Sequence, residues 1–243
     1  MEKQNHERKD SKLIIIKYSV LASIVLLISA LIGSFLKMSS KAVSFTQHFT
    51  AGVVFAAVAT ELLPKILETH SPIHITIGFS LGVIVMVLIK TFTTRETEKS
   101  DQISFAMLTS VGVDLFIDGI LIAIAFLSGE KTGTLMALAL VLEVAFLSLS
   151  LSTDLTQKKT NLRFRMLVFI ALSCMIPLGT GSGLLILNVL PPAFFIEALS
   201  FGAAALLYLV IEELLVEAHE TKDTPIITAS FFLGFLILFL FKD

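Results

Sequence analysis

Residues 110–126, SVGVDLFIDGILIAIAF, carry two aspartates inside an otherwise apolar run. Asp114 and Asp118 are four residues apart, so in a helix both carboxylates lie on one face, one turn from each other. A charged side chain at the centre of a membrane helix costs about 3 kcal/mol or more, so the pair needs a partner, a proton or a cation. The run itself supplies no basic partner. It therefore predicts either an intramembrane cation site or two groups that hydrogen-bond to neighbouring helices.

The whole chain has the composition of an integral membrane protein. Of its 243 residues, 55% are hydrophobic and 16% are charged, and the mean hydropathy is +0.90. These values lie far from those of soluble domains. The net charge of −2 gives no electrostatic basis for binding nucleic acid. The single cysteine, Cys174, can form no intrachain disulfide.

The apolar runs predict an all-α bundle of eight transmembrane helices in one domain, residues 13–243. A polar tail, residues 1–12, precedes them and is expected to be disordered. Each run is long enough to cross a hydrocarbon core of about 30 Å, and the connections are too short to form a soluble domain. The predicted spans are 13–35, 42–69, 73–92, 103–127, 133–155, 162–189, 192–218 and 224–241.

The distribution of Lys and Arg predicts the orientation. Eight spans place both termini on one side of the membrane. The opposite side carries ten basic residues, whereas the side of the termini carries Lys65, Lys131, Lys242 and five in the N-terminal segment. The positive-inside rule therefore favours termini that are not cytoplasmic, although the basic N-terminal tail argues against this. The ten are Lys37, Lys41, Lys90, Arg95, Lys99, Lys158, Lys159, Arg163, Arg165 and Lys222.

An internal repeat relates two parts of the chain at a constant offset of 152. Residues 49–90 align with residues 201–242 without a gap, and 15 of the 42 positions are identical. The identities include charged pairs such as Glu61 and Glu213, so they exceed what two apolar stretches share by chance. With eight spans, the two copies run in opposite directions. This predicts an inverted repeat of outer helix triplets around a central pair, a plan common among secondary transporters.

The central pair of spans carries the acids that we expect to bind a cation. Asp114 and Asp118 lie in the fourth span and Glu143 lies in the fifth. Carboxylate oxygens suit hard divalent cations, and a cluster of like charges stays ionised when a cation offsets it. Glu61 and Glu213 occupy equivalent repeat positions near helix ends. Each is predicted either to be solvated at the interface or to act as a gate or second site.

The seventh span, LSFGAAALLYLVIEELLVEAHE, resembles the seventh helix of the ZIP (Zrt/Irt-like) metal transporters, with its DELLPEAHE-type sequence. The second span, FTAGVVFAAVATELLPKILE, resembles that family's second helix. Residues 116–120, FIDGI, resemble its fourth-helix HNFxDG signature. The resemblance covers nearly the whole chain. It implies eight helices and transport of a divalent metal ion as substrate.

The chain departs from the family pattern at its metal ligands. The family's His and Asn of the fourth helix are Asp114 and Leu115 here, and only Asp118 matches in kind. Of the fifth-helix HExxHE pattern, only Glu143 remains, and Ile176 stands where bacterial members carry a sixth-helix acid. A site that mixes imidazole and carboxylate in the family becomes one of carboxylates alone. Such a site favours ions harder than zinc, such as Mn²⁺, Fe²⁺ or Mg²⁺.

These features are compared with three functions, of which they favour the first. The first is a divalent cation transporter of the ZIP type in the cell membrane, with Asp114, Asp118 and Glu143 as ligands. Its partners are the metal ion and the lipid bilayer, it has no cofactor, and a homodimer is left open. The second is a membrane protein of the same fold that acts through protein interactions without transport. An intramembrane aspartyl protease fits poorly, because Asp114 and Asp118 share one helix, so no enzyme is predicted.

Overall fold

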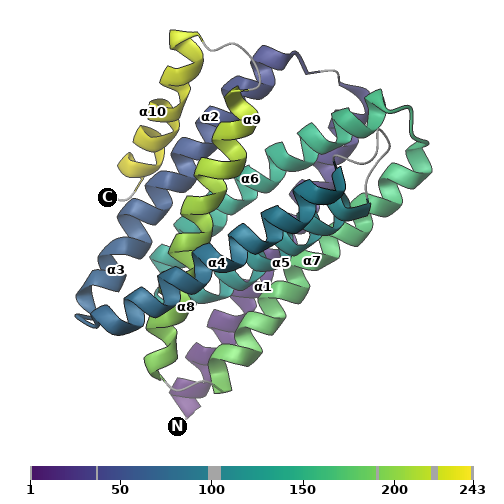
Figure 1. Cartoon of the computed structure of the whole chain (residues 1–243). Coiled ribbons are helices and arrows are strands. Elements are labelled where there is room, and N and C mark those ends of the chain that lie inside the picture. Colours follow the sequence, from purple (N-terminus) through teal and green to yellow (C-terminus); the bar gives the residue numbers. More distant parts are fainter. Residues whose placement is uncertain (1, 37, 98–104, 190–191, 220–223, 242–243) are drawn as a thin grey trace.

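The structure is a computed structural model that describes residues 2–36, 38–97, 105–189, 192–219 and 224–241 (Figure 1). Within these ranges every regular element is a helix. The elements are α1 Glu2–Phe35, α2 Ser40–Ala57, η1 Val58–Leu62, α3 Leu63–Glu68, α4 Pro72–Thr97, α5 Phe105–Leu127, α6 Glu130–Gln157, α7 Leu162–Val189, α8 Pro192–Leu209, η2 Val210–Leu214, α9 Leu215–His219 and α10 Pro225–Leu240.

The helices form a membrane bundle. Within the described ranges, seven helical segments are long and apolar enough to cross a bilayer, and α10 is a shorter apolar helix of 16 residues. Their outer surfaces carry exposed Leu, Ile and Phe side chains, as expected where the solvent is lipid. The protein is therefore a multi-pass helical membrane protein.

Most predicted spans agree with the helices to within a few residues, and α7 coincides with the predicted range 162–189. The N-terminal tail differs, because α1 begins at Glu2 and the polar segment is helical instead of disordered. Pro64 directly follows the first residue after a π-helical segment in the second span. Pro177 lies inside α7, which continues through it.

Two π-helical segments interrupt the second and seventh spans at corresponding positions. η1 covers Val58–Leu62 and η2 covers Val210–Leu214, and these ranges differ by the repeat offset of 152. At each one, the residue that follows donates its N–H to a carbonyl five residues earlier. Such segments are rare and occur frequently at functional sites. Glu61 lies in η1 and Glu213 lies in η2.

The outer helices pack in two pairs, α2 against α10 and α4 against α8. Glycines allow the closest approach in both pairs. A Cβ on Gly82 of α4 would lie 2.7 Å from the carbonyl oxygen of Phe201, and one on Gly234 of α10 would lie 2.1 Å from that of Phe49. These two contacts are equivalent in the repeat, because Gly82 corresponds to Gly234 and Phe49 corresponds to Phe201 at the offset of 152 residues. The same residue types therefore close both helix pairs.

The central helices α5 and α6 contact each other, and each packs on a further long helix, α5 on α7 and α6 on α1. The contact between α5 and α7 is close: a Cβ on Gly119 would lie 2.1 Å from the Ile176 carbonyl oxygen, and one on Gly179 would lie 1.9 Å from that of Phe116. Thr180 donates a hydrogen bond of 3.0 Å to the Gly119 carbonyl. The segment that carries both aspartates is therefore held firmly against α7.

Side-chain contacts define the two ends of the bundle. At the Glu217 end, where α2 begins and α9 ends, Ser44 donates a hydrogen bond of 2.7 Å to the Ala218 carbonyl. At the Lys65 end, where α5 ends and α6 begins, Lys65 donates to the Ser128 carbonyl.

Candidate metal centre

Three carboxylates meet at the contact between α5 and α6. Asp114 and Asp118 come from successive turns of α5, and Glu143 comes from the middle of α6. One ligand atom from each lies within 4.8 Å of the others. The exposed fractions of the three residues are 8%, 1% and 2%. The four-residue spacing predicted from the sequence therefore does place both aspartates on one face, and Glu143 joins them.

The carboxylates are not neutralised by the protein around them. Among the described residues, no Lys, Arg or His forms an ion pair with any of the three. The described part of the chain also offers no hydrogen-bond partner for Asp118 Oδ2 or Glu143 Oε2. Leu115, Leu140 and other apolar side chains fill the layer around them. An unpaired buried carboxylate is costly, and a divalent cation is the group that oxygen donors at this spacing suit.

Glu61 lies in a different environment. It is 6% exposed in η1 and accepts a hydrogen bond of 3.0 Å from Thr132 Oγ1 at the start of α6. It is not part of the three-carboxylate cluster. Its burial excludes the reading that it is solvated at the membrane interface. Thr132 was not predicted as its partner, because nothing in the sequence marks a threonine near a loop as facing a particular helix.

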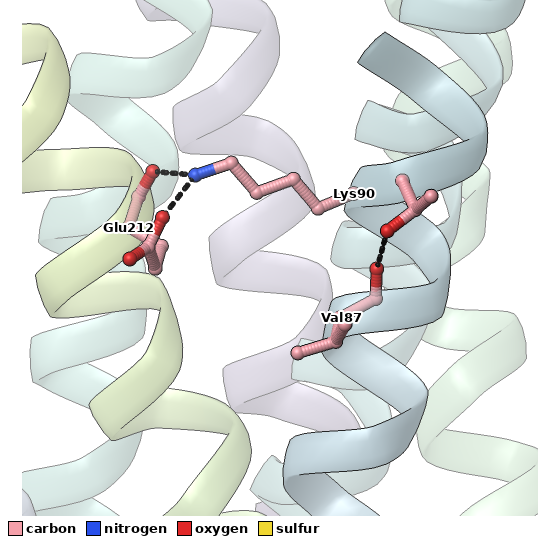
Figure 2. Close-up of polar contacts among 4 residues, drawn as sticks. Val87, Lys90 and Glu212 are labelled. Carbon is pink, nitrogen blue, oxygen red and sulfur yellow. Dashed lines mark hydrogen bonds and ion pairs between the residues drawn. The ribbon is translucent and has the colours of Figure 1, made fainter. Parts of the chain in front are cut away.

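Glu213, the repeat equivalent of Glu61, is half-buried in η2 and is likewise outside the cluster. Its neighbour Glu212 forms an ion pair with Lys90 of α4, with an Nζ–Oε2 distance of 2.5 Å. Lys90 Nζ also donates a hydrogen bond of 2.7 Å to the Glu212 backbone carbonyl, as Figure 2 shows. One lysine therefore ties α4 to the π-helical segment that carries Glu213.

Five of the ten basic residues counted on one side of the membrane lie inside helices, among them Lys90 and Arg165. Lys90 belongs to α4, and Arg165 belongs to α7, is 7% exposed and donates to Thr156 Oγ1. One feature of the sequence marks Lys90, its identity with Lys242 in the repeat. Lys242 itself lies outside the described residues. The excess of basic residues at the Glu217 end still includes Lys41, Lys158 and others at helix ends.

A polar cavity of about 260 Å³ opens at the Glu217 end. Ser150 and Asp154 of α6 line it together with Glu217 of α9, and Ser150 donates a hydrogen bond of 2.7 Å to Glu217. Ser150 lies seven residues after Glu143, so both share one face of α6. The polar residues that line the cavity therefore lie on the face of α6 that carries Glu143.

At the Lys65 end, two hydrogen bonds join the helices. Thr132 donates to Glu61, and Lys65 donates to the Ser128 carbonyl at the end of α5. Ile176, at the position of the family's sixth-helix acid, is fully buried and packs its carbonyl against Gly119. Within the described residues, the acids that meet are thus the three of the central pair.

The comparisons with known proteins identify no relative: no protein-family model matches the chain, and no curated protein matches it.

Proposed function

We propose that the protein transports a divalent metal cation across the membrane, with Asp114, Asp118 and Glu143 as its ligands. The observation that carries the proposal is the cluster of three buried carboxylates within 4.8 Å, two of which have oxygen atoms without a partner in the described chain. Buried ionisable groups within membrane helices mark substrate pathways. The resemblance to ZIP transporters in the second, fourth and seventh spans points to the same substrate class.

The proposed architecture is that of an eight-helix transporter with an inverted repeat around α5 and α6. Two observations support it. The π-helical segments η1 and η2 lie 152 residues apart. The contact of Gly82 with Phe201 and that of Gly234 with Phe49 are equivalent in the repeat. The 16 residues of α10 extend about 24 Å, enough to cross a locally thinned core. In transporters of this plan the substrate binds near the midplane, between the repeats.

The proposed mechanism is alternating access to the three carboxylates. The polar cavity beside Glu217 would provide the path on one side. The contacts of Glu61 with Thr132 and of Lys65 with Ser128 would close the other side. Rocking of the outer helices against α5 and α6 would break one set of contacts and form the other. Glu61 and Glu213 would then act at the two π-helical segments as gate residues.

The ligand set favours hard ions. Three carboxylates without imidazole suit Mn²⁺, Fe²⁺ or Mg²⁺ better than they suit zinc, because zinc sites draw on nitrogen and sulfur donors. We place the protein in the cell membrane with both termini outside the cytoplasm, from the basic residues at the Glu217 end.

Uptake of radioactive divalent cations by proteoliposomes tests the proposal. We expect uptake of at least one ion, lost in Asp118→Asn, which keeps the size of the side chain and removes a charge. Ser110→Ala, two turns away on α5, is the matched control and is expected to retain uptake. If folded, reconstituted protein takes up none of the ions, the protein does not transport them and the interaction hypothesis replaces this one.

A further inference from the structure

The connection between α6 and α7, at the Glu217 end of the bundle, carries a dense group of positive charges. Four of the residues 158–165 are basic and are called the basic cluster here: Lys158, Lys159, Arg163 and Arg165. The first three are exposed. Among the described residues, no acid forms an ion pair with any of the four. The acid nearest to them in the chain, Asp154, lines the polar cavity.

The helix end that carries the two lysines is a Schellman motif. The Lys159 N–H donates to the Thr156 carbonyl at 3.0 Å, and the Thr160 N–H donates to the Leu155 carbonyl at 3.3 Å. Lys159 has a φ of 56°, the left-handed conformation that this motif requires and that favours glycine. The Thr160 hydroxyl also donates to the Leu155 carbonyl at 2.7 Å. The turn is therefore held in place, and it keeps an exposed lysine where glycine is the residue normally found.

Arg165 adds a buried positive charge behind this surface. It lies at the start of α7 and is 7% exposed. Its Nη1 donates to Thr156 Oγ1 in the last turn of α6, and Thr156 donates its own hydroxyl to the Ser152 carbonyl at 2.7 Å. The described residues offer no acceptor for Arg165 Nε. Because a guanidinium always stays charged, this charge is held by neutral groups only and is not compensated by the described chain.

Apolar side chains alternate with the basic ones along the start of α7. Leu162, Phe164 and Leu167 are all exposed. In a membrane bundle such side chains face lipid. The basic cluster therefore lies where α7 passes from the headgroup layer into the hydrocarbon core, a depth from which long basic side chains reach lipid phosphates.

We propose that the basic cluster binds the headgroup of an anionic phospholipid. Lys158, Lys159 and Arg163 supply the exposed donors, and a guanidinium matches the geometry of phosphate oxygens. Arg165 strengthens the positive potential from behind, because a buried charge is screened less than an exposed one. The exposed apolar side chains beside the cluster suit the acyl chains of a lipid, which a free phosphate ion lacks.

The positive-inside rule alone does not account for the basic cluster. That rule needs exposed basic residues near the ends of spans. It requires neither a buried arginine without a carboxylate nor a lysine in a left-handed conformation. Binding at the cluster uses none of the three carboxylates, so this inference goes beyond the proposed transport function and can hold where transport fails.

Native mass spectrometry of the purified full-length protein in detergent tests the proposal. It counts the lipids bound at increasing concentrations of phosphatidylglycerol, or of phosphatidylcholine with the same acyl chains. We expect the protein to prefer phosphatidylglycerol. Lys159→Gln should weaken this binding about fivefold, and the combined changes Lys158→Gln, Lys159→Gln and Arg163→Gln should weaken it about a hundredfold.

Two further variants separate loss of charge from other effects. Lys159→Gly removes the same charge and suits the left-handed turn, so it should weaken binding as Lys159→Gln does without loss of folding. Lys131→Gln is the matched control, because Lys131 is an exposed lysine at the opposite end of α6, and it should bind phosphatidylglycerol as the parent protein does.

A competition experiment distinguishes a lipid from a free anion. Glycerol phosphate carries the phosphate without acyl chains and should displace little lipid at an equal concentration, whereas complete displacement would identify a free-anion site instead. Equal binding of the two lipids would overturn the proposal. Equal losses in Lys131→Gln and Lys159→Gln would mean diffuse attraction by net charge. Unchanged affinity in both Lys159 variants would exclude a site at this turn.

Discussion

At the scale of single residues, the candidate site depends on charge that the protein leaves uncompensated. Asp114, Asp118 and Glu143 are buried together, and the described chain provides no cation for them. Each charge at this depth costs about 3 kcal/mol or more. A fold that needed only helix contacts could use serine or threonine at these positions at far lower cost.

The ligand chemistry of Asp114 can be tested by returning the imidazole that the family carries there. Asp114→His adds a nitrogen ligand and removes one negative charge from a group of three. We expect the ratio of Zn²⁺ to Mn²⁺ affinity to rise about tenfold or more, measured in detergent at one pH. Glu61→Gln is the control, because Glu61 lies outside the cluster, and it should leave the ratio unchanged. An unchanged ratio in Asp114→His would make the aspartates structural.

The sequence was sufficient to place the aspartates but not Glu61. Helix periodicity alone puts Asp114 and Asp118 on one face, and Glu143 on the adjacent span joins them as a third acid. For Glu61 the sequence allowed either a solvated or a buried side chain. Its partner, Thr132, is 71 residues away and begins another helix. Nothing local determines which way a carboxylate near a helix end turns.

At the scale of elements, glycines set how closely α5 and α7 approach. Gly179 faces the Phe116 carbonyl, where a Cβ would lie at 1.9 Å, whereas a Cβ on Gly181 would meet no atom within 4 Å. Gly179→Ala should therefore destabilise the protein by about 1–3 kcal/mol through overpacking. Gly181→Ala should be neutral or stabilise by up to about 1 kcal/mol, because alanine favours a helix. Size-exclusion chromatography after heating in detergent separates the two outcomes, and equal behaviour would contradict this packing.

Lys90 is expected to position the π-helical segment η2 through Glu212. Lys90→Met removes the donor to both the carboxylate and the carbonyl, and should cost about 1–3 kcal/mol because a charged partner is left unpaired. The combined variant Lys90→Met with Glu212→Leu should cost less than the sum of the single changes. Thermal unfolding of the four proteins measures this coupling. Strict additivity would mean that the ion pair contributes nothing to the position of η2.

The local structure of the two π-helical segments could be predicted from the sequence only in part. The repeat aligned Val58 with Val210 and Glu61 with Glu213, so equivalent local structure followed. The sequence did not predict that this structure is π-helical, because one extra residue per turn leaves no periodic pattern over five residues. A proline inside a helix usually kinks or breaks it, but α7 continues through Pro177.

At the scale of the whole molecule, the two ends of the bundle differ although the outer helices are related by the repeat. Lys65 at one end corresponds to Glu217 at the other under the 152-residue offset. Lys65 closes its end by contacting the end of α5, whereas Glu217 lines a polar cavity. An acidic cavity attracts cations on one side, and a lysine on the other repels them.

The basic residues at helix ends predict which end of the bundle faces the cytoplasm. Lys158 is exposed at the Glu217 end, and Lys131 is exposed at the Lys65 end. By the positive-inside rule we expect the Glu217 end to face the cytoplasm. In a Cys174→Ala background, a membrane-impermeant maleimide should label Lys131→Cys in intact cells and Lys158→Cys only after permeabilisation. The reverse pattern would place both termini in the cytoplasm. The polar cavity would then receive ions from outside the cell instead of releasing them within it.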